Sequence, residues 1–117
     1  MDFSLTEMQE EFRTYVRKVL TKESATQIVR DVAKGDETLL TDAHNKLTDL
    51  GIMGILIAEE YGGLELGSTD FIPVMEELGR AVMPDVYAET LAFAAPLIAQ
   101  YGTAQQKQEY LGAITEG

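Results

Sequence analysis

The chain has 117 residues, no cysteine and 45% hydrophobic residues, which suits one globular domain and excludes disulfides, thiolate catalysis and thiolate metal sites. Its 20 acidic and 9 basic residues give a net charge of −11, and no cluster of Lys and Arg is present to attract nucleic acid. No apolar run approaches the ~20 residues of a membrane span and the amino terminus does not resemble a secretory signal, so a cytoplasmic protein is expected.

The first predicted helix begins close to the amino terminus. Ser4 and Glu7 have the spacing of a capping box, and Phe3 can pack on Met8 as a hydrophobic staple. Apolar residues then recur at helical spacing, with acids in the first half and bases toward the end, as the helix dipole prefers. These signals agree on one amphipathic helix that starts at Ser4.

Two more helices are predicted over residues 24–34 and 38–50, and glycines at positions 35 and 51 end them. The apolar segment 52–58 is short and is broken by a glycine, so we predict a buried extended connector. A glycine-rich loop follows it. The next helix should have its cap at Asp70 or slightly later, because Pro73 loses no hydrogen bond in a first turn.

Residues 85–101 form the most informative predicted helix. Glu89 is its one charge between positions 86 and 101, and apolar side chains occupy every face. Pro96 removes a hydrogen bond in the middle and predicts a kink. Five neighbouring helices are too few to cover such a surface, so we expect something outside this chain to cover the rest.

The last predicted helix spans residues 103–115 and opens with the capping pair Thr103 and Gln106. No strand alternation, internal repeat or low-complexity tract interrupts this series. The sequence therefore predicts an all-α domain over residues 1–117, an orthogonal or up-down bundle of about six helices.

Few side chains are candidates for chemistry. His44, the single histidine, lies between polar residues in a helix and is interpreted as a solvated side chain, and no metal site is predicted. Adjacent Glu59 and Glu60 point in different directions, so a turn-stabilising role is preferred over acid–base catalysis. For Gly62 and Gly63 a tight turn with positive φ is preferred over close approach to another segment. No catalytic residue is assigned.

In combination, four segments resemble the amino-terminal helical domain of the acyl-CoA dehydrogenase family: DFSLTEMQEEFRTYVRKVL, DLGIMGILIAEEYGGLELGSTDF, VMEELGRAVMP and YGTAQQKQEYLGAITEG. The similarity covers essentially the whole chain. Ala58 departs from the family, which most often has proline before EEYGG.

This resemblance implies a subunit with a middle β domain and a carboxyl-terminal four-helix domain after the helical one. It implies an oxidoreductase of fatty acid metabolism that desaturates an acyl-CoA thioester at α and β, passes hydride to FAD and is reoxidised by an electron-transfer flavoprotein. The family also implies a homo-oligomer. Because the catalytic base and most FAD contacts belong to the later domains, the 117-residue chain alone is expected to be inactive and colourless.

In the family the helix equivalent to 85–101 lines the acyl-chain pocket. The resemblance therefore makes four residues candidates for the substrate wall, by register from Pro96: Ala88, Leu91, Ala92 and Ala95. Plain helix packing is an equally good interpretation of each. No cofactor-binding residue is assigned in this chain.

Two other classes stay open. One is a non-enzymatic, acidic helical binding module that acts through its apolar helix; its acyl-carrier version lacks the Asp-Ser-Leu motif that carries phosphopantetheine. The other is a dehydrogenase relative recruited to scaffolding. A β domain encoded beyond Gly117 would favour the enzyme.

Overall fold

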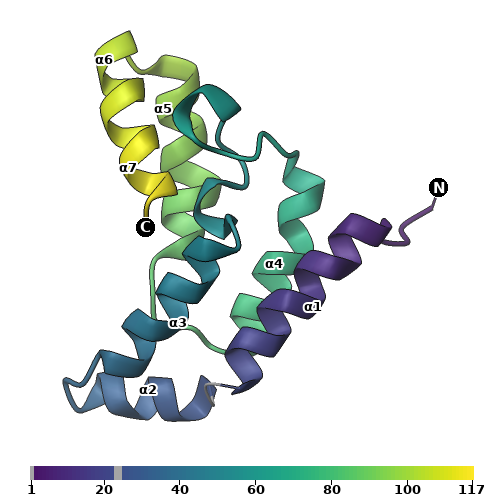
Figure 1. The fold of residues 1–117 in the computed structure, drawn as a ribbon, viewed down its shortest axis with the longest axis vertical. Coiled ribbons are helices and arrows are strands. Elements are labelled where there is room, and N and C mark those ends of the chain that lie inside the picture. Colours follow the sequence, from purple (N-terminus) through teal and green to yellow (C-terminus); the bar gives the residue numbers. More distant parts are fainter. Residues whose placement is uncertain (1, 23–24) are drawn as a thin grey trace.

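The computed structural model describes residues 2–22 and 25–117, and within these ranges every regular element is a helix (Figure 1). The first helices are α1 (Glu7–Lys22), α2 (Ala25–Ala33), α3 (Thr38–Asp49) and α4 (Ser68–Arg80). A π-helical segment, Ala88–Ala94, continues as α5 (Ala95–Tyr101), and the last helix joins α6 (Ala104–Gln106), a π-helical Lys107–Leu111 and α7 (Gly112–Thr115). The predicted all-α fold of six helices is confirmed for the described residues; Ser24, where the second helix was predicted to start, lies outside them.

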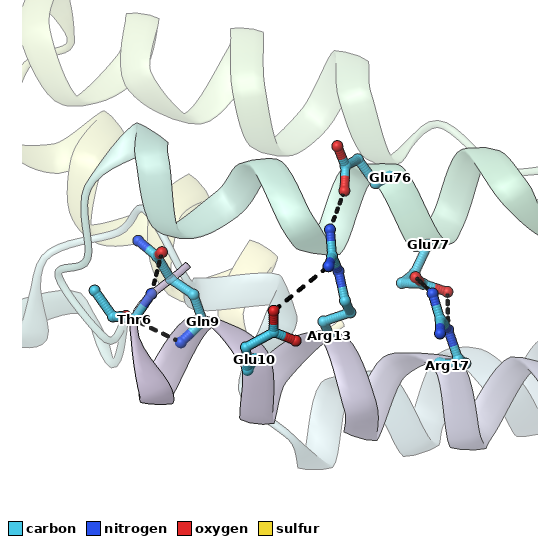
Figure 2. A network of polar contacts seen from close by, with 7 residues as sticks. All are labelled: Thr6, Gln9, Glu10, Arg13, Arg17, Glu76 and Glu77. Atoms are coloured by element: carbon cyan, nitrogen blue, oxygen red, sulfur yellow. Dashed lines mark hydrogen bonds and ion pairs between the residues drawn. The ribbon is translucent and has the colours of Figure 1, made fainter. Parts of the chain in front are cut away.

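The capping box of α1 lies two residues later than predicted. The Gln9 N–H donates to Thr6 Oγ1 at 3.2 Å, and the Thr6 N–H donates to Gln9 Oε1 at 3.0 Å (Figure 2). Phe3 is exposed and forms no staple. The prediction at Ser4 was wrong because Thr6 and Gln9 satisfy the same spacing rule, and Gln9 is also held by a 2.8 Å hydrogen bond to Asp70.

Helix α4 begins two residues before the predicted cap. The Asp70 carboxylate accepts a hydrogen bond from the Gly67 N–H at 2.9 Å, so Asp70 is the third residue of the helix and Gly67 precedes its start. Pro73 consequently lies inside the helix and is buried. The prediction that Pro73 occupies the first turn was wrong by about one turn, because the Asp70 side chain extends the helix backward.

The connector at 52–58 is buried, as predicted, but it is not extended. Ile52–Gly54 forms a 3₁₀ turn, and Gly51 enters it with φ of 81°. Ile55 and Ile57 are also buried. A tight turn brings several apolar side chains into the core from one short segment, which an extended strand would divide between two faces.

The helices form a thin slab rather than a round bundle. Helices α1 and α4 lie side by side, α2 lies across one end, and α3 runs from that end toward the middle of the molecule (Figure 1). The helix from Ala88 to Tyr101 pairs with the last helix at the other end. The Cα extents are 40 × 40 × 20 Å. Since one helix is roughly 10–12 Å wide with its side chains, a layer 20 Å thick leaves part of each helix uncovered.

Two apolar clusters hold the slab together. The larger cluster joins α1, α3, α4 and the start of the 88–101 helix, and its buried members include Val16, Leu20, Leu47, Ile52, Ile55, Val74, Leu78 and Leu91. The smaller cluster fixes the last helix against the 88–101 helix through Ile57, Ala95 and Leu111. The helix Ala88–Tyr101, called the apolar helix below, is thus anchored from one side by both clusters.

Candidate functional site

One flank of the apolar helix is bare. Phe93, Leu97 and Tyr101 follow one another at four-residue spacing, and their side chains are 74%, 52% and 73% exposed. Val86, before the first turn, is 58% exposed. Aromatic and aliphatic side chains in a contiguous exposed row are typical of surfaces that another molecule or domain covers. The prediction that five companion helices leave this helix partly uncovered is confirmed.

The four predicted pocket residues lie on different sides of this helix. Ala88 and Ala92 are exposed. Leu91 is buried in the larger core cluster, and Ala95 is buried in the smaller one. Only Ala88 and Ala92 are therefore available to a molecule that approaches the exposed side of the helix; the pocket role of all four stays a prediction.

The turns before Pro96 are π-helical, which the sequence did not reveal. The Ala95 N–H donates to the Thr90 carbonyl, five residues back, directly before the residue that has no N–H. Wide turns of this kind are rare and often occur at functional sites. The helix thus widens directly before Pro96, which has no N–H to donate; the kink at Pro96 stays a prediction.

A cavity of about 410 Å³ lies between α3, the start of the apolar helix and the last helix. Its wall is largely apolar, with Leu91, Ile98 and Ile114 among its members, and its polar end is formed by His44, Asp85, Tyr87 and Thr90. The volume is within the range of small-molecule sites.

His44 is half-buried in this wall, so its interpretation as a solvated side chain was wrong. Its ring stacks on Tyr87 with centroids 5.8 Å apart and an angle of 28° between the planes. Nδ1 of His44 lies 3.1 Å from the Tyr87 hydroxyl oxygen and 3.6 Å from the nearest oxygen of Asp85. The contact was missed because both partners are about forty residues away in the sequence.

Tyr87 is held in its neutral form. Burial of the phenol, together with the nearby Asp85 carboxylate, raises the pKa of Tyr87 far above its ordinary value. The Tyr87 hydroxyl therefore acts as a hydrogen-bonding group at this end of the cavity at any physiological pH.

The loop of sequence EEYGG is a packed turn. Gly62 has φ of 87°, as the tight-turn interpretation requires. At Gly63 the other interpretation holds, since an added Cβ would lie 1.9 Å from the Ile57 carbonyl oxygen. Glu59 and Glu60 are exposed, and the Glu59 N–H donates to the Glu65 carboxylate at 3.1 Å. The loop thus forms a packed turn that leads into α4, with both acids on its outer side.

A buried carboxylate joins α1 to α4. Glu77, with a side chain 3% exposed, accepts hydrogen bonds from Arg17 Nη2 at 2.6 Å and Arg17 Nε at 3.1 Å, and from Arg80 Nε at 2.8 Å (Figure 2 shows Arg17 and Glu77). The Arg17 guanidinium is the main cause that lowers the pKa of Glu77, against the effect of burial. This cluster is structural, because it connects the two helices through a buried carboxylate.

Other classes of site find little support in the part of the chain that the structure describes. No group of three His, Asp or Glu side chains there could hold a metal ion. Across residues 2–22 and 25–117, no helix is long and apolar enough to cross a bilayer. Among the described residues, no Lys or Arg lines the 410 Å³ cavity.

The family of the chain follows from comparison with known proteins. The model of the family described as "Acyl-CoA dehydrogenase, N-terminal domain" matches residues 6–117. The chain belongs to the acyl-CoA dehydrogenase family. This confirms the resemblance seen in the four sequence segments.

Two curated relatives align over the full chain. The short-chain-specific acyl-CoA dehydrogenase of Clostridium acetobutylicum is 33% identical over 121 residues, which cover 100% of this chain and 31% of that protein. The acryloyl-CoA reductase (NADH) of Anaerotignum propionicum is 30% identical over 118 residues, with 100% and 29% covered. The chain spans about a third of the length of these relatives.

Solved structures agree. The chain resembles butyryl-CoA dehydrogenase from Megasphaera elsdenii with 30% identity and a TM-score of 0.75, over 99% of this chain and 31% of that one. It also resembles a chain of the structure described as the electron transferring flavoprotein of Acidaminococcus fermentans, with 31% identity and a TM-score of 0.77, over 100% and 31%.

Proposed function

We propose that this chain is the amino-terminal helical domain of an FAD-dependent acyl-CoA dehydrogenase. The observation that carries the proposal is the bare flank of the apolar helix, where Phe93, Leu97 and Tyr101 are more than half exposed. In the proposed subunit a middle β domain and a carboxyl-terminal helical domain cover this flank. A domain interface buries such a row of side chains in the same way as a protein core.

Within that subunit, Ala88 and Ala92 form part of the wall of the acyl pocket. Both are exposed on the apolar helix, and their small side chains leave room for an acyl chain. Leu91 and Ala95 hold the helix from behind, because both are buried in the core clusters. The two roles are assigned from burial, because a ligand can contact only the exposed side of the helix, while the core of this domain packs against the opposite side.

The remaining chemistry belongs to other parts of the proposed subunit. When bound there, FAD would supply the hydride-accepting chemistry, and an electron-transfer flavoprotein is the proposed partner that would reoxidise it; no Lys or Arg of the described residues lines the 410 Å³ cavity. The subunit assembles as a homo-oligomer and is cytoplasmic. One relative is named as a reductase of acryloyl-CoA and another as an acyl-CoA dehydrogenase, and α,β-desaturation is the direction proposed here.

The test is isolation of the native protein with an antibody raised against residues 1–117. The proposal expects a polypeptide about three times as long as this chain, since relatives are matched over 31% of their length, with bound flavin that is bleached by an acyl-CoA. A native polypeptide that ends at Gly117 and binds neither flavin nor acyl-CoA would overturn the proposal and favour the helical binding module.

The wall is tested separately in the same native enzyme. Ala92→Phe should raise KM for longer acyl-CoA substrates more than for short ones, because the ring occupies the space of the acyl chain. Ala33→Phe, at the exposed end of α2, is the matched control and should leave both unchanged. Equal kinetics of Ala92→Phe and the wild type with all chain lengths would remove Ala92 from the wall.

A further inference from the structure

Tyr87 is the last residue before the π-helical segment Ala88–Ala94, and it is tied to a different helix. It is 5% exposed, and its ring stacks on His44 of α3. The distance from its hydroxyl oxygen to His44 Nδ1 is 3.1 Å. One hydrogen bond and one ring contact thus join α3 to the point where the apolar helix begins.

Asp85 adds a second connection at the same place. One carboxylate oxygen accepts a hydrogen bond from the Val86 N–H at 2.8 Å, and the other lies 3.6 Å from His44 Nδ1. The two residues that flank Val86 therefore both face the same imidazole nitrogen. A single ring on α3 holds both sides of this turn.

The remaining neighbours of His44 come from its own helix and from the end of the described chain. The Thr48 hydroxyl donates to the His44 carbonyl at 2.9 Å, and the Gly117 carbonyl oxygen is 3.4 Å from Nε2. Asp85 and Tyr87 are the titratable side chains recorded against the ring among the described residues.

The first turns of the apolar helix need such a connection. They have no side-chain cap at the amino-terminal end. Their first hydrogen bond joins the Thr90 N–H to the Val86 carbonyl at 3.0 Å, and the π-helical bonds that follow are of the wide i to i−5 kind. Phe93 is exposed, so burial of the segment depends mainly on Leu91. Without the contacts of His44 with Asp85 and Tyr87, called the tether below, these turns would open locally at low cost in free energy.

We propose that His44, Asp85 and Tyr87 are positioning residues that tie the first turn of the apolar helix to α3 and so fix where Ala88 and Ala92 stand. The consequence for Ala88 and Ala92 rests on the proposed function. The tether itself does not, because it consists of contacts within this chain. It also explains why a tyrosine is buried at this point with its hydroxyl directed at a polar partner.

Amide hydrogen exchange of the 117-residue chain tests the tether. Tyr87→Phe keeps the ring and removes the hydroxyl, and His44→Phe keeps an aromatic ring and removes both nitrogens. Each should speed exchange of residues 88–95 by roughly 5- to 10-fold, the effect of one lost hydrogen bond, and the double variant should do little more than either single one. Exchange in α1 and α4 should not change.

Tyr110→Phe is the matched control. Tyr110 lines the same cavity and is 48% exposed, and no hydrogen bond of its hydroxyl is recorded in the described residues. Its variant should exchange like the wild type. Unchanged exchange in Tyr87→Phe, equal acceleration in Tyr110→Phe, or acceleration spread through α1 and α4 would each overturn the proposal.

A spectroscopic readout separates positioning from general packing. Because His44 is the single histidine, its imidazole ring protons give one identifiable set of NMR signals. At fixed pH, Asp85→Asn and Tyr87→Phe should each shift these signals, because each changes a group that lies 3.6 Å or 3.1 Å from Nδ1, whereas Tyr110→Phe should leave them in place. Unshifted signals in Asp85→Asn would show that Asp85 does not act on the ring. Neither measurement needs acyl-CoA or flavin, so the tether and the proposed function can fail independently.

Discussion

The buried carboxylate between α1 and α4 gives the sharpest stability prediction. Glu77→Gln removes the charge that pairs with Arg17 and Arg80 and keeps the shape of the side chain. Removing one member of a buried ion pair costs about 3–5 kcal/mol, and one hydrogen bond to a charged group is worth about 1.5–3. The side chains of Arg17 and Arg80 are 53% and 51% exposed, so both regain water. We therefore expect a loss of about 2–3 kcal/mol in the free energy of unfolding.

Urea unfolding at neutral pH measures this loss. With a slope of about 1–3 kcal/mol per molar urea for a small domain, the midpoint should fall by about 1–2 M. Glu76→Gln is the control, because Glu76 pairs with Arg13 but its side chain is 56% exposed, and it should cost no more than about 1 kcal/mol. Equal losses in the two variants would refute the reasoning that burial decides the strength of these pairs.

The same pair predicts a pH dependence. Arg17, and to a lesser degree Arg80, lower the pKa of Glu77 in the folded chain. A carboxyl group with a lowered pKa stabilises the fold fully above its unfolded pKa of about 4.3, and loses this effect as pH falls through the folded value. The difference between wild type and Glu77→Gln should therefore be constant from pH 7 to about 5 and shrink below about pH 4. A difference that grows on acidification would contradict this assignment.

Two further substitutions test local geometry. Gly63→Ala should destabilise the fold by more than about 2 kcal/mol in the same unfolding assay, because the added Cβ would overlap the Ile57 carbonyl. Gly79→Ala is the control and should be neutral or stabilising, because no atom lies within 4 Å of its added Cβ. Similar results for the two variants would refute the close approach at Gly63. Thr103→Ala should lower the free energy of unfolding by about 1 kcal/mol, because Thr103 Oγ1 accepts a hydrogen bond from the Gln106 N–H at 3.2 Å. Thr103→Ser keeps the hydroxyl and should retain most of the wild-type stability. A neutral Thr103→Ala would show that the cap contributes nothing.

The sequence predicted the helices well where local signals agree. Gly35 and Gly51 have φ of 86° and 81° and end their helices, and Thr103 with Gln106 forms the predicted box. These features depend on residues a few positions apart, which a single sequence displays directly. The start of α1 was misplaced because Ser4 and Thr6 both satisfy the spacing, and only a distant partner, Asp70, distinguishes them.

The site was predicted less completely, because its contacts join distant parts of the chain. Composition alone showed that the apolar helix has too many apolar faces to be enclosed, and Phe93 and Tyr101 are indeed exposed. The π-helical turns set which faces of this helix point toward the core, and no local sequence pattern predicted these turns. His44 with Tyr87 is a contact across 43 positions, and a polar sequence environment hid it.

Dye binding and sedimentation of the 117-residue chain test most directly whether the flank of the apolar helix is made to be covered. The chain should bind a hydrophobic dye or self-associate as its concentration rises. The double variant Phe93→Ser, Leu97→Ser should abolish both dye binding and self-association. It should not lower the free energy of unfolding, because both side chains are more than half exposed. A wild-type chain that stays monomeric and leaves the dye unchanged, or a double variant that behaves like the wild type, would contradict it.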